Sequence, residues 1–176
     1  MRKFLKTRAF VLRKKPLLEK NLRLILFTQK YGKMSLFAYG IRNIKSRRLS
    51  HIETGNLIEV VVDERKEGYF LKESQLISSF FLIKKNSSKL KLFYLFLFIL
   101  DRLLPENQKE EGVYWLIYDF NQRLAKMKNL EKQIFFKYLN KLMITLGYLE
   151  KEMRSEELLS FIENLINEEI PSFIKV

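Results

Sequence analysis

The chain has 176 residues, of which 47% are apolar and 30% charged, an ordinary composition for one large or two small globular domains. It contains no cysteine and a single histidine, which excludes disulfides, thiolate nucleophiles, zinc ribbons and iron–sulfur clusters. The longest apolar run, Leu92 to Leu100, is about half the length of the roughly 20 residues that cross a bilayer. The basic first ten residues lack the apolar segment of a signal peptide. A cytoplasmic protein without membrane contact is therefore expected.

Positive charge is concentrated at the start of the sequence. Fifteen of the 33 Lys and Arg residues lie between Arg2 and Arg48, and Glu19 is the one acidic residue among them. The excess in this stretch is therefore fourteen positive charges, more than the +13 of the whole chain. Solubility alone would not require such segregation. A dense local positive charge attracts polyanions by counterion release, so the sequence predicts nucleic-acid binding.

The first 80 residues are rich in β-formers and broken by turn residues. Alternation and turn signals predict five strands, joined in two places by short glycine-containing turns at Gly32 and Gly68. Five short strands without a long helix between them favour an OB-fold barrel, although an SH3-like barrel fits the pattern almost as well. The expected strands cover residues 4–14, 22–30, 33–39, 55–63 and 69–78.

After residue 80 the apolar period changes to three and four, which is typical of amphipathic helices. The sequence predicts helices over residues 90–104, 113–127, 130–149 and 156–168, with Pro105 and Gly147 at helix ends. The overall prediction is an α+β chain with an OB-fold DNA-binding domain at 1–80 and an all-α helical domain at 81–176. The expected helical core includes Trp115, Tyr118, Phe120, Phe135, Phe136, Tyr138, Met143 and Phe161.

Residues 40–54 hold a basic segment that we interpret as an exposed loop. Arginine matches phosphate bidentately, lysine adds a point charge, and serine can donate to phosphate oxygens. A solvated loop without a ligand is the simpler alternative, but the neighbouring strands are basic as well. The predicted DNA-binding residues are Arg13, Lys14, Lys30, Tyr31, Lys33, Tyr39, Arg42, Lys45, Ser46, Arg47 and Arg48.

Aromatic residues are interleaved with these cations. Rings exposed on single-strand-binding OB-folds stack on bases, while cations follow the backbone. A small barrel also needs apolar filling, so Phe10, Phe27 and Phe37 are expected to point inward, and Tyr31 and Tyr39 are the candidates for stacking.

The sequence offers little that resembles a catalytic site. His51 has no second His or Cys with which to share a metal, and no phosphate-binding glycine loop or nucleophile elbow is present. Asp63, Glu64 and Glu67 could hold Mg²⁺ for a small nuclease, but a polar turn explains them more simply. A non-enzymatic protein without cofactors is expected. The alternatives that stay open are an RNA-binding OB module and, with weaker support, that nuclease.

Several segments of the first half resemble the RecO family of DNA-repair and recombination mediators. They are TRAFVLR at 7–13, LILFTQKYGK at 24–33, AYGIRNIKS at 38–46 and the run at 57–62. The patterns LFT-x-x-x-G and G-x-R-x-x-K-S in this order are fairly specific together. The second half is similar mainly in the helix after Pro105 and in the LGYL at 146–149.

The resemblance implies an OB-fold followed by a helical domain, without catalytic activity. It also implies binding to single- and double-stranded DNA, annealing of complementary strands, contact with single-strand-binding protein, and action with RecR in a nucleoid-associated setting. By position, it assigns DNA contacts to Arg13, Lys30, Lys33, Arg42, Lys45, Arg47 and Arg48. Many relatives carry a cysteine zinc motif that this sequence lacks, so no zinc is expected, and the chain is shorter than typical relatives.

Overall fold

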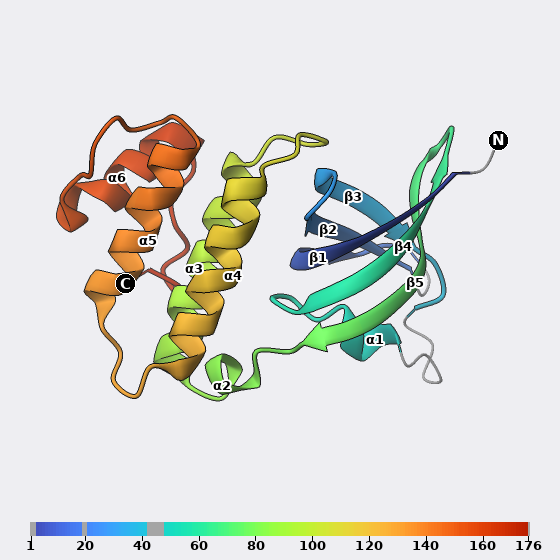
Figure 1. Cartoon of the computed structure of the whole chain (residues 1–176), viewed down its shortest axis with the longest axis horizontal. Coiled ribbons are helices and arrows are strands. Elements are labelled where there is room, and N and C mark those ends of the chain that lie inside the picture. Colours follow the sequence, from blue (N-terminus) through green and yellow to red (C-terminus); the bar gives the residue numbers. More distant parts are fainter. Residues whose placement is uncertain (1–2, 19–20, 42–47, 176) are drawn as a thin grey trace. The chain divides into compact units, whose positions relative to one another are not determined.

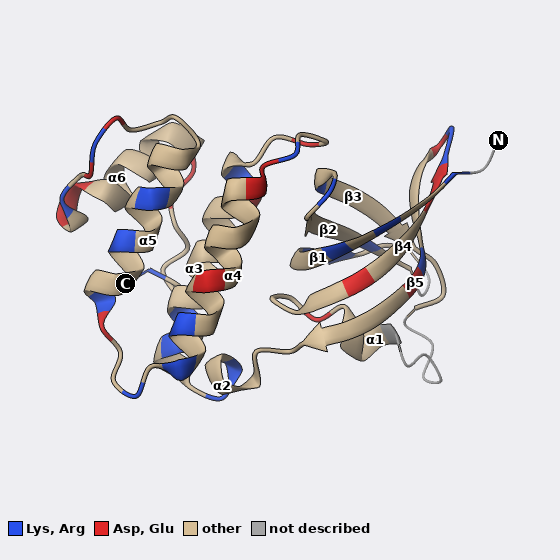
Figure 2. Ribbon diagram, in the orientation of Figure 1, with Lys and Arg blue, Asp and Glu red and all other residues tan. Residues whose placement is uncertain are grey.

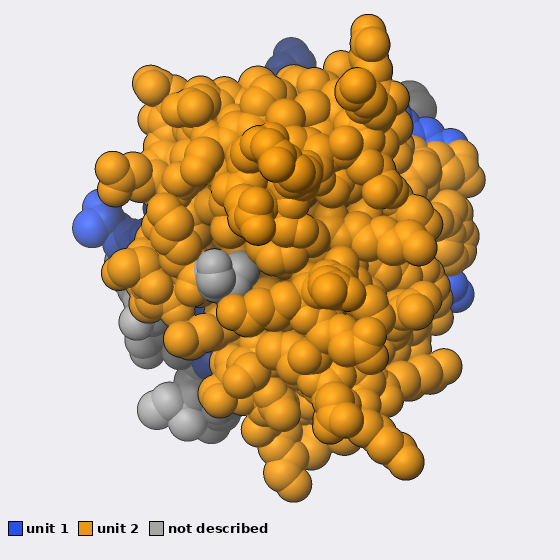
Figure 3. Space-filling view, turned by 90° about the vertical axis from the view of Figure 1, so that its left-hand side faces the viewer, with its two compact units in different colours: residues 1–80, 104–110 blue, residues 81–103, 111–176 orange. Residues whose placement is uncertain are grey.

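The computed structural model describes residues 3–18, 21–41 and 48–175, and Arg48 is described only in its backbone. The chain divides into two compact units, distinguished by colour in Figure 3. Unit 1 consists of residues 1–80 and 104–110, and unit 2 consists of residues 81–103 and 111–176. The sequence had placed 104–110 in the helical part, whereas these seven residues belong to the first unit.

Unit 1 is a closed five-stranded barrel with the strand order β1-β2-β3-β5-β4, which is an OB-fold (Figure 1). Its strands are β1 (Lys3–Pro16), β2 (Leu22–Thr28), β3 (Gly32–Ala38), β4 (Leu57–Arg65) and β5 (Gly68–Ser78). Neighbouring strands are antiparallel except β3 and β5, whose short parallel pairing closes the barrel. The five predicted strands are confirmed, with ends shifted by a few residues.

Strand β1 takes part in two halves of the barrel. Its first half pairs with β4 and its second half with β2, and the register shifts between Val11 and Arg13. Such an irregularity bends a strand and lets one long strand turn a barrel corner. Side chains that alternate along the strands fill the interior. They include Leu5, Ala9, Val11, Leu24, Leu26, Met34, Leu36, Ile58, Val60, Val62 and Leu71.

The expectation that Phe10, Phe27 and Phe37 point into the barrel interior was only partly right. Phe10 and Phe27 are fully buried and Phe37 is half-buried, but none of the three belongs to the barrel core, because they alternate with the inward-pointing residues of their strands. The ring of Phe10 instead stacks on that of Phe80, with centroids 6.4 Å apart. The segment 40–54 is not simply an exposed loop either: it contains α1 (Arg48–His51), and both Ile41 and Ile52 are buried in the barrel core.

The segment 104–110 packs against the turn between β2 and β3 within unit 1. The backbone N–H of Asn107 donates to the carbonyl oxygen of Lys33 at 2.8 Å, and Glu106 forms an isolated bridge with Lys33. Gly32 adopts a φ of +72°, and an added Cβ would lie 1.8 Å from the carbonyl oxygen of Gln108. Only glycine fits this turn, for reasons of both backbone conformation and space.

Unit 2 contains α2 (Phe81–Lys84), α3 (Ser87–Leu103), α4 (Glu111–Lys126), α5 (Lys132–Thr145) and α6 (Ser155–Ile166). Its core is built around Phe120 of α4, whose ring lies 4.4 Å from Phe96, 6.1 Å from Phe135 and 5.4 Å from Tyr138 between centroids. The predicted helices from residue 90 onward are confirmed in type. Trp115 and Tyr118, expected in the core, are substantially exposed, because they lie on the other side of α4 from its buried residues.

A buried lysine links two helices of unit 2. Lys89 on α3 is 6% exposed, and its ammonium donates to the carbonyl oxygens of Ala125 at 3.2 Å and Met127 at 2.6 Å. These oxygens lie at the carboxyl end of α4, where the last turn of a helix lacks intrahelical donors. The backbone N–H of Lys89 itself donates to Oδ1 of Asn86, which caps α3.

Candidate nucleic-acid interface

Charge on the barrel is less one-sided than the sequence suggests. Strand β4 brings acidic residues beside the first half of β1, so Lys3 pairs with Glu64 at 3.3 Å and Lys6 pairs with Glu59 at 2.8 Å. Figure 2 shows the basic positions along β1 and the acidic positions on β4. Since these pairs neutralise each other, the first half of β1 is a poor polyanion surface.

The second half of β1 has a different electrostatic environment. Its neighbour is β2, and the register places Lys15 directly opposite Arg23. Both side chains are exposed, and within the described residues no carboxylate pairs with either. Like charges directly opposite each other destabilise a sheet, and a bound anion relieves that repulsion. We call Lys15 and Arg23 the cation pair.

Three aromatic rings lie beside the cation pair on the outside of the barrel. Arg23 is opposite Phe37 in the β2–β3 ladder, and Phe37 is opposite Phe70 where β3 pairs with β5. The ring of Tyr39, which follows β3, lies 5.6 Å from Phe70 and 6.4 Å from Phe37 between centroids. We call Phe37, Tyr39 and Phe70 the ring cluster.

Hydrogen bonds fix the surroundings of the ring cluster. The N–H of Gly40, immediately after Tyr39, donates to Oδ1 of Asn21 at 3.0 Å, which ties the chain after β3 to the β1–β2 connection. On β2, Nε of Arg23 donates to Oγ of Ser35 at 2.6 Å, and its guanidinium lies 5.9 Å from the centre of the Phe37 ring. The cation pair and the ring cluster thus form one continuous surface on unit 1.

The predicted DNA-binding residues fall into two groups at opposite ends of the β2–β3 hairpin. Arg13, Lys14 and Tyr39 lie toward the end that carries the cation pair, whereas Lys30, Tyr31 and Lys33 lie at the hairpin turn. Strands of seven residues separate these ends by about 20 Å.

The predicted DNA-binding residues differ in the contacts that their side chains make. Lys14 forms an ion pair with Glu53, and Lys30 is exposed. The ring of Tyr31 packs against the barrel core, and Lys33 is bridged to the segment 104–110. The remaining predicted positions, Arg42, Lys45, Ser46 and Arg47, lie outside the described residues, as does the side chain of Arg48.

Four residues of this surface were not among the predicted DNA-binding residues: Lys15, Arg23, Phe37 and Phe70. Arg23 lies in a largely apolar strand, Phe37 was expected inside the barrel, and Phe70 follows a turn that we interpreted only by its carboxylates. Alternation along β5 could have placed Phe70 on the outside of the barrel. Its position beside Phe37 follows only from the parallel pairing of β3 and β5.

Comparison with known proteins places this barrel in a family. The family described as "Recombination protein O N terminal" matches residues 1–80. A DNA repair protein RecO of Caldanaerobacter subterraneus subsp. tengcongensis is 32% identical over 148 residues, which is 84% of this chain and 60% of the relative. The chain belongs to the RecO family.

Other RecO proteins match over a similar length of the chain. The DNA repair protein RecO of Thermoanaerobacter sp. strain X514 is 30% identical over 148 residues, covering 84% of this chain and 59% of the relative. That of Chlorobium limicola is 24% identical over 145 residues, covering 81% of this chain and 56% of the relative. The chain therefore spans about 60% of the length of these RecO relatives.

Two of the three carboxylates of the nuclease alternative form ion pairs in this RecO chain. Oδ2 of Asp63 accepts from Arg65 at 2.7 Å, and Glu64 pairs with Lys3. In the parts of the chain that the structure describes, no three His, Asp or Glu residues gather as a metal site would require. Helices within the same parts include none long and apolar enough to cross a membrane.

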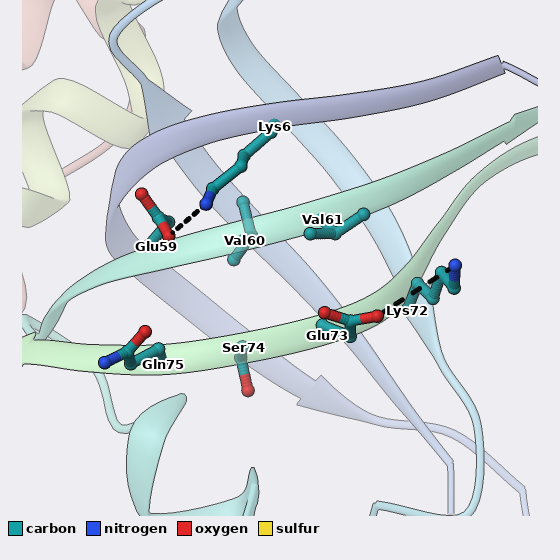
Figure 4. A pocket seen from close by; sticks show the side chains of 8 residues that line it. All are labelled: Lys6, Glu59, Val60, Val61, Lys72, Glu73, Ser74 and Gln75. Atoms are coloured by element: carbon teal, nitrogen blue, oxygen red, sulfur yellow. Dashed lines mark ion pairs between the residues drawn. The ribbon is translucent and has the colours of Figure 1, made fainter.

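A shallow hollow of about 570 Å³ lies over β1, β4 and β5 (Figure 4). Its charged side chains pair with one another: Lys6 with Glu59 at 2.8 Å, and Lys72 with Glu73 at 3.9 Å. Because these charges cancel, the hollow offers a polyanion less than the surface formed by the cation pair and the ring cluster does.

Proposed function

We propose that this RecO-family chain binds DNA through its barrel and anneals complementary strands in recombinational repair, with RecR and single-strand-binding protein as partners. The observation that carries the proposal is the family match over the barrel, since its relatives are named DNA repair proteins. The cation pair supplies the charge that a sugar-phosphate backbone requires. Holding two strands on a basic surface neutralises their mutual repulsion, which favours pairing.

Annealing is tested with complementary strands that carry fluorescent labels and are precoated with single-strand-binding protein. We expect the protein to speed their pairing well beyond the spontaneous rate, because it must both engage the coated strands and neutralise them. A generic RNA-binding module should fail this test. Pairing no faster than without the protein would contradict the annealing proposal, and tighter binding of structured RNA than of DNA at equal salt would favour the alternative.

Replacing both Lys15 and Arg23 with alanine should weaken DNA binding about equally for all sequences. Each phosphate that the variant no longer neutralises should reduce the slope of log affinity against log salt by about 0.9, because fewer counterions are released. Titration of labelled DNA at several salt concentrations measures both quantities.

The matched control removes the same charge from the neutralised part of the barrel. Lys3→Ala with Lys6→Ala also deletes two positive charges, but both belong to ion pairs with β4. We expect this double variant to change the salt slope less than the Lys15 and Arg23 variant does. Equal slopes for the two variants would mean that net charge, and not the cation pair, determines binding.

The basic positions between 42 and 48 remain part of the proposal. Reversing the charge of Arg42, Lys45, Arg47 and Arg48 together should also lower the affinity and the salt slope, by roughly one unit for each phosphate that is no longer neutralised. An unchanged slope would remove this segment from the interface.

A further inference from the structure

We propose that the ring cluster is a stacking site for an unpaired nucleic-acid base, which lets the barrel distinguish single strands from duplex. This inference rests on the proposed function and adds an interaction that phosphate binding does not provide. It is carried by the arrangement of Phe37, Tyr39 and Phe70 on the outer surface of unit 1.

The three rings are nearly parallel. The planes of Phe37 and Tyr39 differ by 10°, those of Tyr39 and Phe70 by 22°, and those of Phe37 and Phe70 by 30°. Phe70 is 8% exposed, whereas Tyr39 is 56% exposed and lies at the open side of the cluster. A flat apolar surface of this orientation suits a further planar ring.

Arg65 packs against one ring of the cluster. The guanidinium of Arg65 lies 4.3 Å from the centre of the Phe70 ring, and Asp63 orients it through an ion pair of 2.7 Å. Asp63 is itself buried. Because Phe70 is fixed between Arg65 and the other rings, a ligand that stacks on Tyr39 meets a surface that needs little ordering.

The charges beside the cluster favour a nucleotide over an apolar protein segment. Arg23 lies on the strand next to Phe37, with its guanidinium 5.9 Å from the centre of that ring. Lys15 lies one strand further, so its backbone is about 10 Å from that of Phe37 along the sheet. A nucleotide carries an aromatic base and an anionic phosphate at this kind of separation. An apolar peptide would leave the cation pair without a counterion.

Stacking on this site requires an unpaired base. In a duplex the bases are stacked on their neighbours and paired, and exposing one costs several kcal/mol. Phosphates, in contrast, are available on single and double strands alike. The ring cluster should therefore contribute to single-strand binding and the cation pair to both.

The test compares Tyr39→Ala with the wild-type chain on a single-stranded oligonucleotide and on a blunt duplex of equal length. We expect single-strand affinity to fall about fivefold to a hundredfold, duplex affinity to stay within about twofold, and the salt slope to be unchanged. A 2-aminopurine base in the single strand should change its fluorescence on binding the wild type and much less on binding the variant.

Two controls separate stacking from general effects. Tyr39→Phe keeps the ring and should keep both the affinity and the fluorescence change. Phe173→Ala removes a ring of unit 2 that is 72% exposed, and it should alter neither. Because Tyr39 is exposed, all three variants should retain the thermal unfolding of the wild type.

The outcomes distinguish this inference from the proposed function. If the wild type binds DNA and Tyr39→Ala loses single-strand and duplex affinity equally, or loses neither, the stacking site is wrong and the proposed function stands. If the wild type binds neither form of DNA, the proposed function fails, and the stacking site fails with it.

Discussion

Replacing Gly32 with alanine is expected to destabilise the barrel unit by about 3 kcal/mol. A φ of +72° costs an alanine about 1 kcal/mol, and overpacking adds about 1–3 kcal/mol. Here the new Cβ would lie 1.8 Å from the carbonyl oxygen and 2.4 Å from the carbonyl carbon of Gln108. Backbone atoms cannot rotate away as a side chain can, so the segment 104–110 must move.

Urea unfolding followed by circular dichroism measures the loss of stability. Hydrogen exchange provides the local readout, because the N–H of Asn107 donates to Lys33 beside Gly32 and should lose protection in the variant. Gly147→Ala is the matched control: its φ is +79°, and nothing lies within 4 Å of the added Cβ. It should cost only the backbone strain. Equal losses for the two variants would show that the approach to Gln108 is not tight.

Replacing Lys89 with methionine is expected to destabilise the helical unit by about 3 kcal/mol. The ammonium donates to two carbonyl oxygens, those of Ala125 and Met127, and hydrogen bonds to charged groups contribute about 1.5–3 kcal/mol each. Methionine has a similar length and restores the apolar packing, but it leaves both oxygens without that donor. The carboxyl end of α4 should fray first.

Chemical unfolding and hydrogen exchange at the end of α4 test this expectation. Lys91→Met supplies the control, because Lys91 lies on the same helix, is exposed and has no such role. Its effect should stay within about 0.5 kcal/mol. If Lys89→Met lost as little unfolding free energy as Lys91→Met, water would replace the ammonium at no cost. The link between α3 and α4 would then not be important for stability.

The barrel strands were predictable because their signals are local. Alternation between apolar and polar residues is a property of each strand alone, and Gly32 and Gly68 mark turns by their own conformational freedom. The limits of such reasoning are visible at Phe10 and Phe37. Burial tendency alone assigned both to the barrel interior, against the alternation of their neighbours, but Phe10 is buried against Phe80 outside the barrel core and Phe37 is only half-buried.

The interface was less predictable than the fold. Sequence proximity grouped Lys30, Lys33 and the residues after Tyr39 into one basic region, but the β2–β3 hairpin separates its two ends by about 20 Å. Sequence proximity also missed that β4 neutralises the first half of β1. The net charge of a sequence segment therefore differs from the net charge of the surface that it forms, because strands distant in sequence become neighbours in the barrel.

The amino-acid sequence by itself determined the number and type of most elements, the change of period near residue 80, the excess of basic residues in the first fifty positions, and a resemblance to RecO proteins. The tertiary structure decided which side chains meet. Arg23, Phe37 and Phe70 become neighbours only because β3 pairs with β2 on one side and with β5 on the other. Periodicity encodes which side of a strand is buried, whereas the closure of the barrel sets which strands lie side by side.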